Sequence, residues 1–146
     1  MTPAPQNGRQ IALNADFTEL PRLAAWTEAA LAELRPDDRT AYALQLCIEE
    51  LVANVVLHGR RAAGPITITL RLEMAPLRLT IEDDAQGFDP TATTMPDAET
   101  VGGRGLLLVR RFCREWRYAR RDGRNVLELV FSEGRGACPS STPAGN

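Results

Sequence analysis

The chain has 146 residues, the length of one ordinary domain, with 44% hydrophobic residues, 25% charged residues and a net charge of −2. This charge argues against a nucleic-acid binder that relies on bulk positive charge, so we expect no direct nucleic-acid partner. All 17 basic residues are arginine, which excludes a P-loop and a protein-kinase fold with its phosphate-binding lysine, and one histidine with three scattered cysteines excludes histidine-rich and CxxC-type metal sites.

The two ends of the chain predict no regular structure. Residues 1–8 are polar and proline-containing, and we expect them to be disordered, while residues 133–146 form a polar tail that we expect to be flexible. The N-terminal residues lack the apolar core of a signal peptide, and no uninterrupted apolar run reaches the roughly 18–20 residues that span a bilayer. We therefore expect one domain over residues 9–132, in a cytoplasmic protein without a membrane segment.

The first half of the domain predicts one strand followed by two helices. Residues 10–15 alternate in polarity as a short strand does, and residues 20–34 repeat apolar side chains at helical spacing. The next helix, over residues 39–57, is the strongest element; either aspartate of 37–38 can cap its start, and Gly59 is a plausible C′ glycine after its end. The stripes expected to face the core are Leu20, Leu23, Ala24, Leu31 and Leu34 on the first helix and Leu44, Ile48, Leu51, Val52 and Val55 on the second.

The second half predicts two hairpins separated by a long loop and a short helix. The loop is rich in Gly, Pro, Thr and Asp and has no periodicity, and loops of this length are usually functional or mobile. The expected elements are strands over 65–73 and 77–83, the loop over 84–104, a helix over 106–113, and strands over 115–121 and 125–131 joined across 122–124. This order predicts an α+β two-layer sandwich in which the helices cover one face of a mostly antiparallel sheet.

A line of polar side chains runs along the helix expected over residues 39–57. Glu50, Asn54 and His58 follow one another at four-residue steps and therefore stack on one side, away from Ile48. A solvated polar face explains this line. The wall of a site, in which a carboxylate base and an amide are fixed on a rigid helix, explains it as well.

Two further motifs carry groups suited to ligand binding. A hydrophobic strand ends in Asp83 and Asp84 shortly before Gly87, and such carboxylates can accept hydrogen bonds from a ligand amine, with an acidic turn as the alternative. A glycine-rich stretch, residues 102–105, precedes the helix that starts at Leu106. A helix N-terminus of this kind presents backbone N–H groups to an anion, although an ordinary turn has the same composition.

The three motifs occur in a specific order: E-x-x-x-N on a helix, D-x-A-x-G after a strand, and G-x-G-L before a helix. This order resembles the N, G1 and G2 boxes of the GHKL ATP-binding fold, also called the histidine-kinase-like or Bergerat fold. Residues 50–59 (ELVANVVLHG) and 103–109 (GRGLLLV) resemble more narrowly the anti-sigma-factor serine kinases of the RsbW/SpoIIAB type. The resemblance covers residues 11–131, nearly the whole domain.

The resemblance implies a role for each matching residue. Asn54 would offer its amide oxygen to Mg²⁺ on the phosphates of ATP, and Glu50 would be the catalytic base that orients or deprotonates the attacking hydroxyl. Asp83 would accept a hydrogen bond from the adenine amino group, and Gly87 would let the backbone approach the base. Residues 89–102 would form the ATP lid. The implied phosphate-binding residues are Gly103, Gly105, Leu106 and Arg104, with a solvent-facing Arg104 as the alternative.

One position departs from the family pattern. The chain has Ala85 where the G1 box has glycine, and a left-handed backbone there would strain an alanine by roughly 1–2 kcal/mol. If that conformation is required, we expect weaker nucleotide binding than in relatives.

The family implies a stand-alone serine/threonine-protein kinase that is also an anti-sigma factor. It would sequester a sigma factor and use ATP to phosphorylate a serine on a STAS-domain anti-anti-sigma antagonist. A homodimer is implied as well, and the implied partner surface includes Arg22 on the first helix and the lid. The alternatives are a non-catalytic nucleotide-binding module that acts by sequestration, favoured by Ala85, and a histidine-kinase-type catalytic domain. In the latter, His58 would be the phosphoacceptor rather than a structural residue at a helix end.

Two residue groups have simple expected roles. The arginine-rich stretch over residues 110–124 is expected to be a solvated face with salt bridges, with a docking surface for an acidic protein as the alternative. Cys47 and Cys113 are expected to be small buried side chains, and Cys138 is expected to be a thiol of the tail.

Overall fold

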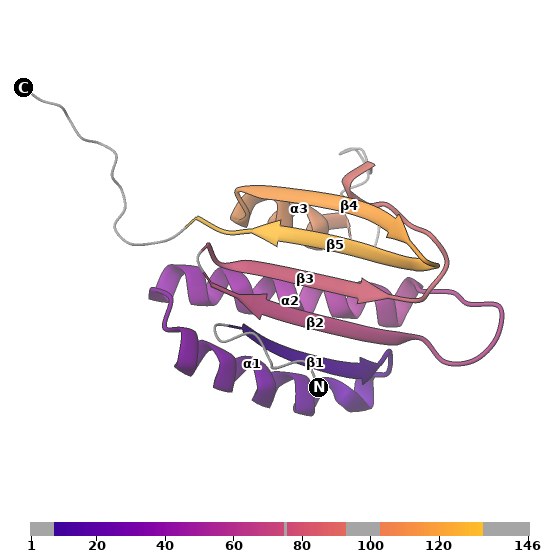
Figure 1. Ribbon diagram of the computed structural model, residues 1–146, viewed down its shortest axis with the longest axis horizontal. Helices are drawn as coiled ribbons and strands as arrows, with labels where there is room; N and C mark the ends of the chain where they lie inside the picture. Colours follow the sequence, from indigo (N-terminus) through magenta and orange to yellow (C-terminus); the bar gives the residue numbers. More distant parts are fainter. Residues whose placement is uncertain (1–7, 75, 93–102, 133–146) are drawn as a thin grey trace, which may run out of the picture.

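This computed structural model describes residues 8–74, 76–92 and 103–132, which contain five strands and three α-helices (Figure 1). They are β1 (Gly8–Asn14), α1 (Leu20–Leu34), α2 (Asp38–His58), β2 (Thr67–Glu73), β3 (Arg78–Asp83), α3 (Gly103–Phe112), β4 (Glu115–Arg121) and β5 (Arg124–Val130), with short 3-10 helices η1 (Phe17–Glu19) and η2 (Pro90–Ala92). The predicted succession of elements is confirmed. The predictions for both chain ends and for most of the lid lie outside the described residues.

The sheet has the strand order β1-β2-β3-β5-β4, and all four neighbouring pairs are antiparallel. The helices lie on one face of it, with α1 and α2 behind β1 to β3 and α3 behind β4 and β5 in Figure 1. The predicted α+β two-layer sandwich is therefore confirmed, and its sheet is antiparallel throughout the described residues. Because β5 lies between β3 and β4, the pair of β3 and β5 joins positions far apart in the sequence.

The row of side chains that faces the helices ends in a polar pair. Alternation along a strand sends every second side chain to the same face. On β3 this row is Leu79, Ile81 and Asp83, and the partners on β5 are Leu129, Leu127 and Asn125. Asp83 and Asn125 are both buried. The apolar core thus gives way to polar groups at the point where β3 runs into the next loop.

α2 is the central helix of the core. Its buried residues are Thr40, Ala43, Leu44, Cys47, Ile48, Leu51 and Val52. The predicted stripe is thereby confirmed, with Val55 only partly buried. By length and composition alone α2 could also cross a bilayer, although Glu49 and Glu50 interrupt its apolar run. Its buried side chains pack in the core of this domain, and this packing accounts for its hydropathy.

The stripe on α1 is narrower than predicted. Its buried residues are Leu23, Thr27 and Ala30, which follow one another at helical spacing, whereas Ala24 is exposed and its assignment to the core is wrong. Ala24 lies at the edge of the stripe because one residue step turns a helix by about 100°. The hydroxyl of Thr27 donates a hydrogen bond to the carbonyl of Leu23 (2.9 Å), which allows a polar residue in this position.

The two ends of α2 are fixed by different means. Asp37 caps the start, because its side chain accepts a hydrogen bond from the N–H of Thr40 (2.7 Å). Gly59 follows the last residue with extended backbone (φ −64°, ψ 143°), so the prediction of a left-handed C′ glycine is wrong. A Cβ at this position would lie 2.5 Å from the carbonyl oxygen of Val55 and 3.1 Å from Cδ1 of Ile66. Close packing therefore requires the glycine.

The last hairpin turns more tightly than predicted. Arg121 pairs with Arg124, so the connection has two residues, Asp122 and Gly123, instead of the three predicted. Both have positive φ, 49° and 76°, as the type I′ turn of a two-residue hairpin requires. This turn sets the register of β5 against β4 and therefore places Asn125 opposite Arg120.

Candidate functional site

The carboxylate of Asp83 is a buried acceptor at the end of β3. Its Oδ1 accepts hydrogen bonds from the N–H of Ala85 (3.0 Å) and from Nδ2 of Asn125 (2.8 Å), and no hydrogen bond within the described residues reaches Oδ2. Burial raises the pKa of Asp83, and the charge of Asp84 adds to the rise, whereas the hydrogen bonds from Asn125 and Ala85 and the charge of Arg120 lower it. Oδ2 is therefore able to accept a hydrogen bond from a ligand.

Asn125 forms hydrogen bonds to Asp83, to the loop that follows β3 and to β4. Its Nδ2 donates to three acceptors, namely the carboxylate of Asp83 (2.8 Å) and the carbonyls of Gln86 (3.1 Å) and Ala85 (3.4 Å). Its Oδ1 accepts from three donors, namely the N–H of Phe88 (3.1 Å), Nη1 of Arg120 (3.1 Å) and the hydroxyl of Tyr118. One buried amide, paired at both its oxygen and its nitrogen, thus joins two strands and a loop in a polar network.

The described start of this loop, residues 84–92, carries none of the backbone strain that Ala85 suggested. In the described chain the non-glycine residues with positive φ are Arg35 and Asp122, so the concern about a left-handed Ala85 is wrong for this structure. A Cβ at Gly87 would lie 3.5 Å from Nε of Arg120, an ordinary contact. The protein's own packing therefore does not require glycine at this position, and the role of Gly87 in admitting a base stays a prediction.

The same loop is tied to the segment that follows α2. The N–H of Gln86 donates to the carbonyl of Arg60 (2.6 Å), which lies two residues after the helix ends. The guanidinium of Arg61 lies 3.7 Å from one carboxylate oxygen of Asp84, and the other oxygen accepts from the N–H of Thr67 (2.8 Å). The loop is therefore held from two sides, by β4 and β5 and by the chain after α2.

The polar line of α2, Glu50, Asn54 and His58, occupies the C-terminal half of the helix. In Figure 1 the C-terminal end of α2 and the C-terminal end of β3 lie at the same end of the sheet. Glu50 and Asn54 are half-buried and His58, the last residue of the helix, is exposed. Glu50 and Asn54 therefore lie in the half of α2 that runs toward the Asp83 end of the domain, and no hydrogen bond within the described residues joins these three side chains.

α3 begins earlier than predicted, at Gly103 instead of residue 106, so the glycines at 103 and 105 lie in its first turn. The first four N–H groups of a helix have no partner within it, and here they belong to residues 103–106. The N–H of Arg114, just after α3, donates to the carbonyl of Val130 (2.7 Å) at the far end of β5, so the N-terminus of α3 points back toward the Asp83 end (Figure 1). The side chain of Arg104 and residues 93–102 of the predicted lid lie outside the described part.

Residues 13–131 match the model of one protein family, described as the histidine kinase-like ATPase domain. The chain belongs to this family. The match extends from β1 to the end of β5, so it includes α2, Asp83 and Asn125 in a single domain. Membership in an ATPase-domain family implies that the chain uses ATP, and it confirms the resemblance found from the three motifs.

Two relatives and one solved structure show what else this chain is similar to. The serine/threonine-protein kinase BtrW of Bordetella bronchiseptica is 35% identical over 113 residues, which are 72% of this chain and 80% of BtrW. The anti-sigma F factor of Bacillus thuringiensis is 30% identical over 96 residues, 60% of this chain and 65% of that protein. The crystal structure of the RsbU and RsbW domains of Rv1364c from Mycobacterium tuberculosis aligns with a TM-score of 0.64 and 21% identity, over 94% of this chain and 36% of that one. The structural match confirms the fold, and the two relatives are a kinase and an anti-sigma factor.

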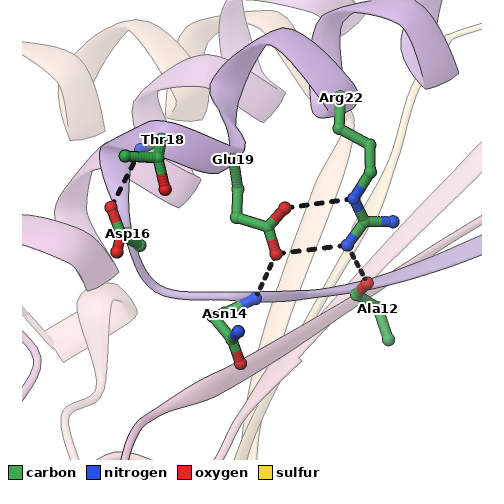
Figure 2. A network of polar contacts seen from close by, with 6 residues as sticks. All are labelled: Ala12, Asn14, Asp16, Thr18, Glu19 and Arg22. Carbon is green, nitrogen blue, oxygen red and sulfur yellow. Dashed lines mark hydrogen bonds and ion pairs between the residues drawn. The ribbon is translucent and has the colours of Figure 1, made fainter.

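Arg22, the predicted partner residue, is held in a polar network at the start of α1 (Figure 2). Its guanidinium donates to both carboxylate oxygens of Glu19 (3.0 and 3.2 Å) and to the carbonyl of Ala12 (2.7 Å). Glu19 also accepts from the N–H of Asn14 (3.0 Å), and the hydrogen bond from Arg22 is the main cause that lowers the pKa of Glu19. Because Ala12 and Asn14 lie on the edge strand β1, the pair covers part of that edge. The role of Arg22 in partner binding stays a prediction.

The arginine-rich stretch divides between two roles. Arg117 and Arg124 lie 3.5 and 3.7 Å from the carboxylates of Glu115 and Glu82, as expected of a solvated face with salt bridges. Arg120 differs, because its Nη1 donates to the carbonyl of Ala85 (2.9 Å). One member of the stretch therefore belongs to the candidate site.

Sequence reasoning missed Asn125, Tyr118 and Arg120. A signal for Asn125 was present, because an amide stands in the inward row of β5, where the next inward residues are Leu127 and Leu129. A polar residue in an otherwise apolar row of a strand indicates a buried partner. Nothing comparable distinguished Arg120 from the arginines beside it.

The predictions for two of the cysteines are confirmed. Cys47 and Cys113 are buried free thiols. Burial, with smaller effects of Cys113 and Glu50, raises the pKa of Cys47 to about 12, and burial also raises the pKa of Cys113. Such thiols are poor nucleophiles at neutral pH. Cys138 lies outside the described residues.

Proposed function

We propose that this chain is an RsbW-type serine/threonine-protein kinase that binds Mg-ATP and acts as an anti-sigma factor. The observation that carries the proposal is the buried carboxylate of Asp83, which keeps one oxygen for a ligand at the end of the sheet toward which the Glu50 and Asn54 half of α2 runs. Family membership supports ATP as the nucleotide. The kinase BtrW and the anti-sigma F factor support the two activities.

The adenine base would bind at Asp83. Its Oδ2 would accept a hydrogen bond from the exocyclic amine, a donor that guanine replaces with a carbonyl. The phosphates would lie at the N-terminus of α3, where free N–H groups and the positive end of the helix dipole attract anions. Because the chain has no lysine, the phosphate charge must be met by these amides, by arginine and by a metal ion. Arg104, in the first turn of α3, is the arginine that we assign to this role.

The residues present fit a magnesium ion that takes most of its ligands from phosphate and water. Among the described residues no group of three or more His, Cys, Asp and Glu side chains could hold a metal, so the protein alone does not form a closed metal site. Mg²⁺ prefers oxygen ligands and keeps several waters, and a single amide oxygen from Asn54 therefore suffices. When bound, the ion would neutralise charge on the phosphates.

Glu50 is proposed as the base for phosphoryl transfer. The hydroxyl oxygen of a substrate serine forms a bond to the γ-phosphorus, and the bond from that phosphorus to the oxygen of ADP breaks. The hydroxyl proton passes to the carboxylate of Glu50. Glu50 lies one turn before Asn54 on α2, so the helix fixes the distance between the base and the metal-binding amide. The protein contributes positioning and charge, which are the main requirements of this reaction.

The proposed partners are a sigma factor, which the chain would sequester, and a STAS-domain antagonist, whose serine it would phosphorylate. The proposed contact surface includes Arg22, which Glu19 holds ready in one orientation. A hollow of about 480 Å³ lies between the ends of β1 and α2 and is lined in part by Asn14, Asp16, Val55, Arg60, Arg61 and Ile66. A homodimer and a cytoplasmic location, both implied by the resemblance, belong to the same proposal.

Two observations weaken the alternatives. The unstrained backbone of Ala85 removes the one residue that favoured a module acting by sequestration alone. His58 is the exposed last residue of α2, and a basic side chain in this position interacts favourably with the helix dipole. A structural role therefore accounts for His58 without phosphorylation.

The test combines nucleotide binding with phosphoryl transfer. Purified protein is titrated with ATP with and without Mg²⁺, and is then incubated with candidate STAS-domain proteins and γ-labelled ATP. We expect Mg²⁺-dependent binding, label on a serine of the STAS protein, and loss of transfer with retained ATP binding in Glu50→Ala. The matched control is Glu49→Ala, since Glu49 is the exposed neighbour on the same helix. Absence of ATP binding would refute the proposal, and binding without transfer to any candidate would leave the sequestration module as the better account.

A further inference from the structure

The side-chain amide of Asn125 has one orientation that satisfies its surroundings. Three donors meet Oδ1: the N–H of Phe88, Nη1 of Arg120 and the hydroxyl of Tyr118. Three acceptors surround Nδ2: the carboxylate of Asp83 and the carbonyls of Ala85 and Gln86. Exchanging the two ends of the amide would set donors against donors and acceptors against acceptors. The amide is therefore fixed by its neighbours.

The fixed amide in turn fixes the carboxylate of Asp83. Both hydrogen bonds that this carboxylate accepts within the described residues end on Oδ1, one from Asn125 and one from the N–H of Ala85. Rotation of the carboxylate would break at least one of them, and Asp83 is buried, so water does not readily replace the lost bond. Oδ2 is consequently held in one direction.

Arg120 holds the amide and the loop at the same time. Its Nη1 donates to Oδ1 of Asn125 (3.1 Å) and to the carbonyl of Ala85 (2.9 Å). Its side chain also lies against Gly87, where a Cβ would be 3.5 Å from Nε. Asn125 on β5 and Arg120 on β4 are direct cross-strand partners, so the last hairpin supplies both residues from one face. We call this pair the hairpin clamp.

We propose that the hairpin clamp, Asn125 and Arg120, sets the preference of this chain for adenine by holding Oδ2 of Asp83 toward the exocyclic amine of the base. Both are positioning residues, because they act through Asp83. The proposal rests on the proposed function, ATP binding at Asp83, and adds the residues on which recognition of the base depends. Loss of the clamp would release the carboxylate from this direction, while the phosphate contacts at α3 would remain.

Two nucleotides that differ by one group provide the test. ATP carries the exocyclic amine, and purine riboside triphosphate lacks it. For the full chain with Mg²⁺ we expect ATP to bind about 10- to 100-fold more tightly than the analogue, the effect of one hydrogen bond to a charged acceptor. In Asn125→Leu, which keeps a similar size, this ratio should fall to near one while the analogue binds as in the wild type. In Arg120→Met the ratio should fall by about 2- to 10-fold, the effect of one lost hydrogen bond on an amide that its other two donors still hold.

Matched variants separate positioning from a general structural role. Arg124→Leu and Arg121→Met change exposed neighbours on the same two strands that face the other side of the sheet, and both should keep the wild-type ratio. Asp83→Asn should lower the ratio to near one, and adding Asn125→Leu should change it no further, because both substitutions remove the same contact. An equal loss of affinity for both nucleotides in Asn125→Leu would show a merely structural residue and overturn the inference.

Folding of each variant is checked by thermal unfolding. If Asn125→Leu does not fold, Arg120→Met decides, because Arg120 is exposed and its removal leaves the core unchanged; an unchanged ratio in this variant would overturn the clamp. A wild-type chain that binds both nucleotides equally would overturn the inference while leaving ATP binding intact. A wild-type chain that binds neither would refute the proposed function itself.

Discussion

Replacing Gly59 with alanine tests whether conformation or packing requires this glycine. Its backbone (φ −64°, ψ 143°) is one that any residue adopts. On dihedral angles alone, Gly59→Ala should raise the free energy of unfolding by about 0.4–1 kcal/mol, because alanine reduces the freedom of the unfolded chain. The added Cβ, however, would lie 2.5 Å from the carbonyl oxygen of Val55 and 3.1 Å from Cδ1 of Ile66. The two arguments predict opposite signs.

We expect the packing term to be the larger one. The carbonyl of Val55 accepts the hydrogen bond of the Gly59 N–H (2.8 Å), so it cannot move away without breaking a bond at the end of the helix. Overpacking a well-packed position costs about 1–3 kcal/mol. For a domain near this size, that cost corresponds to a fall in Tm of roughly 2–12 °C. Thermal unfolding and urea denaturation measure it.

Gly87→Ala is the matched control for Gly59→Ala. A Cβ at Gly87 would lie 3.5 Å from Nε of Arg120, an ordinary contact, and the backbone there is outside the left-handed region. The free energy of unfolding should therefore rise by about 0.4–1 kcal/mol, because alanine reduces the freedom of the unfolded chain and meets no clash here. An unchanged or raised Tm in Gly59→Ala, with an unchanged urea m-value, would refute the packing argument.

Three further predictions concern Asp83, Arg22 and the buried thiols. Burial raises the folded-state pKa of Asp83, so its favourable contribution to stability is present below the unfolded pKa, about 4, and is lost as the pH rises through the folded value. In thermal unfolding, the Tm of the wild type should therefore fall relative to the Tm of Asp83→Asn as the pH rises through this range. A rise of the wild-type Tm relative to that of the variant would contradict the prediction. Arg22→Ala should lower the affinity for a sigma factor or STAS-domain partner by about tenfold or more in surface plasmon resonance, with the affinity for ATP unchanged. Arg9→Ala, which removes an arginine paired with Glu33 (2.8 Å), should leave the affinity for the partner unchanged. Equal losses of affinity in the two variants would argue against a specific contact of Arg22. In a Cys138→Ser variant at pH 8, Cys47 and Cys113 should react with a thiol reagent only after unfolding in urea, and fast reaction of the native protein would contradict their burial.

Much of the fold could be predicted because the spacing of apolar residues indicates which face of each helix or strand is buried. The apolar spacing of residues 20–34 gave the bounds of α1, and the alternation of residues 65–73 and 77–83 gave the β2–β3 hairpin. The start of α3 was placed too late because glycine is a poor helix former, and its sequence therefore resembles a loop. The extended backbone of Gly59 could not be read from the sequence, since it depends on a contact with Ile66 across the fold.

The candidate site was predictable only where one segment carries the signal. Asp83 became a candidate because a carboxylate ends an apolar strand, and Glu50 and Asn54 became candidates because helical spacing aligns them. Asn125 follows an Asp-Gly turn, where asparagine is common for local reasons, so its sequence neighbours conceal its role. Its partner Asp83 lies 42 residues away, and only the β3–β5 register brings the two together.

The insertion of β5 between β3 and β4 makes the surroundings of Asp83 depend on the completion of the chain by the ribosome. Domains are synthesised from the N-terminus, and their early segments emerge first. A nascent chain that ends before residue 124 already contains Glu50, Asn54 and Asp83, but β3 is then an edge strand whose carboxylate lacks Asn125. If Asp83 selects adenine as proposed, this selection begins only after the last hairpin has closed, and incomplete chains do not acquire it.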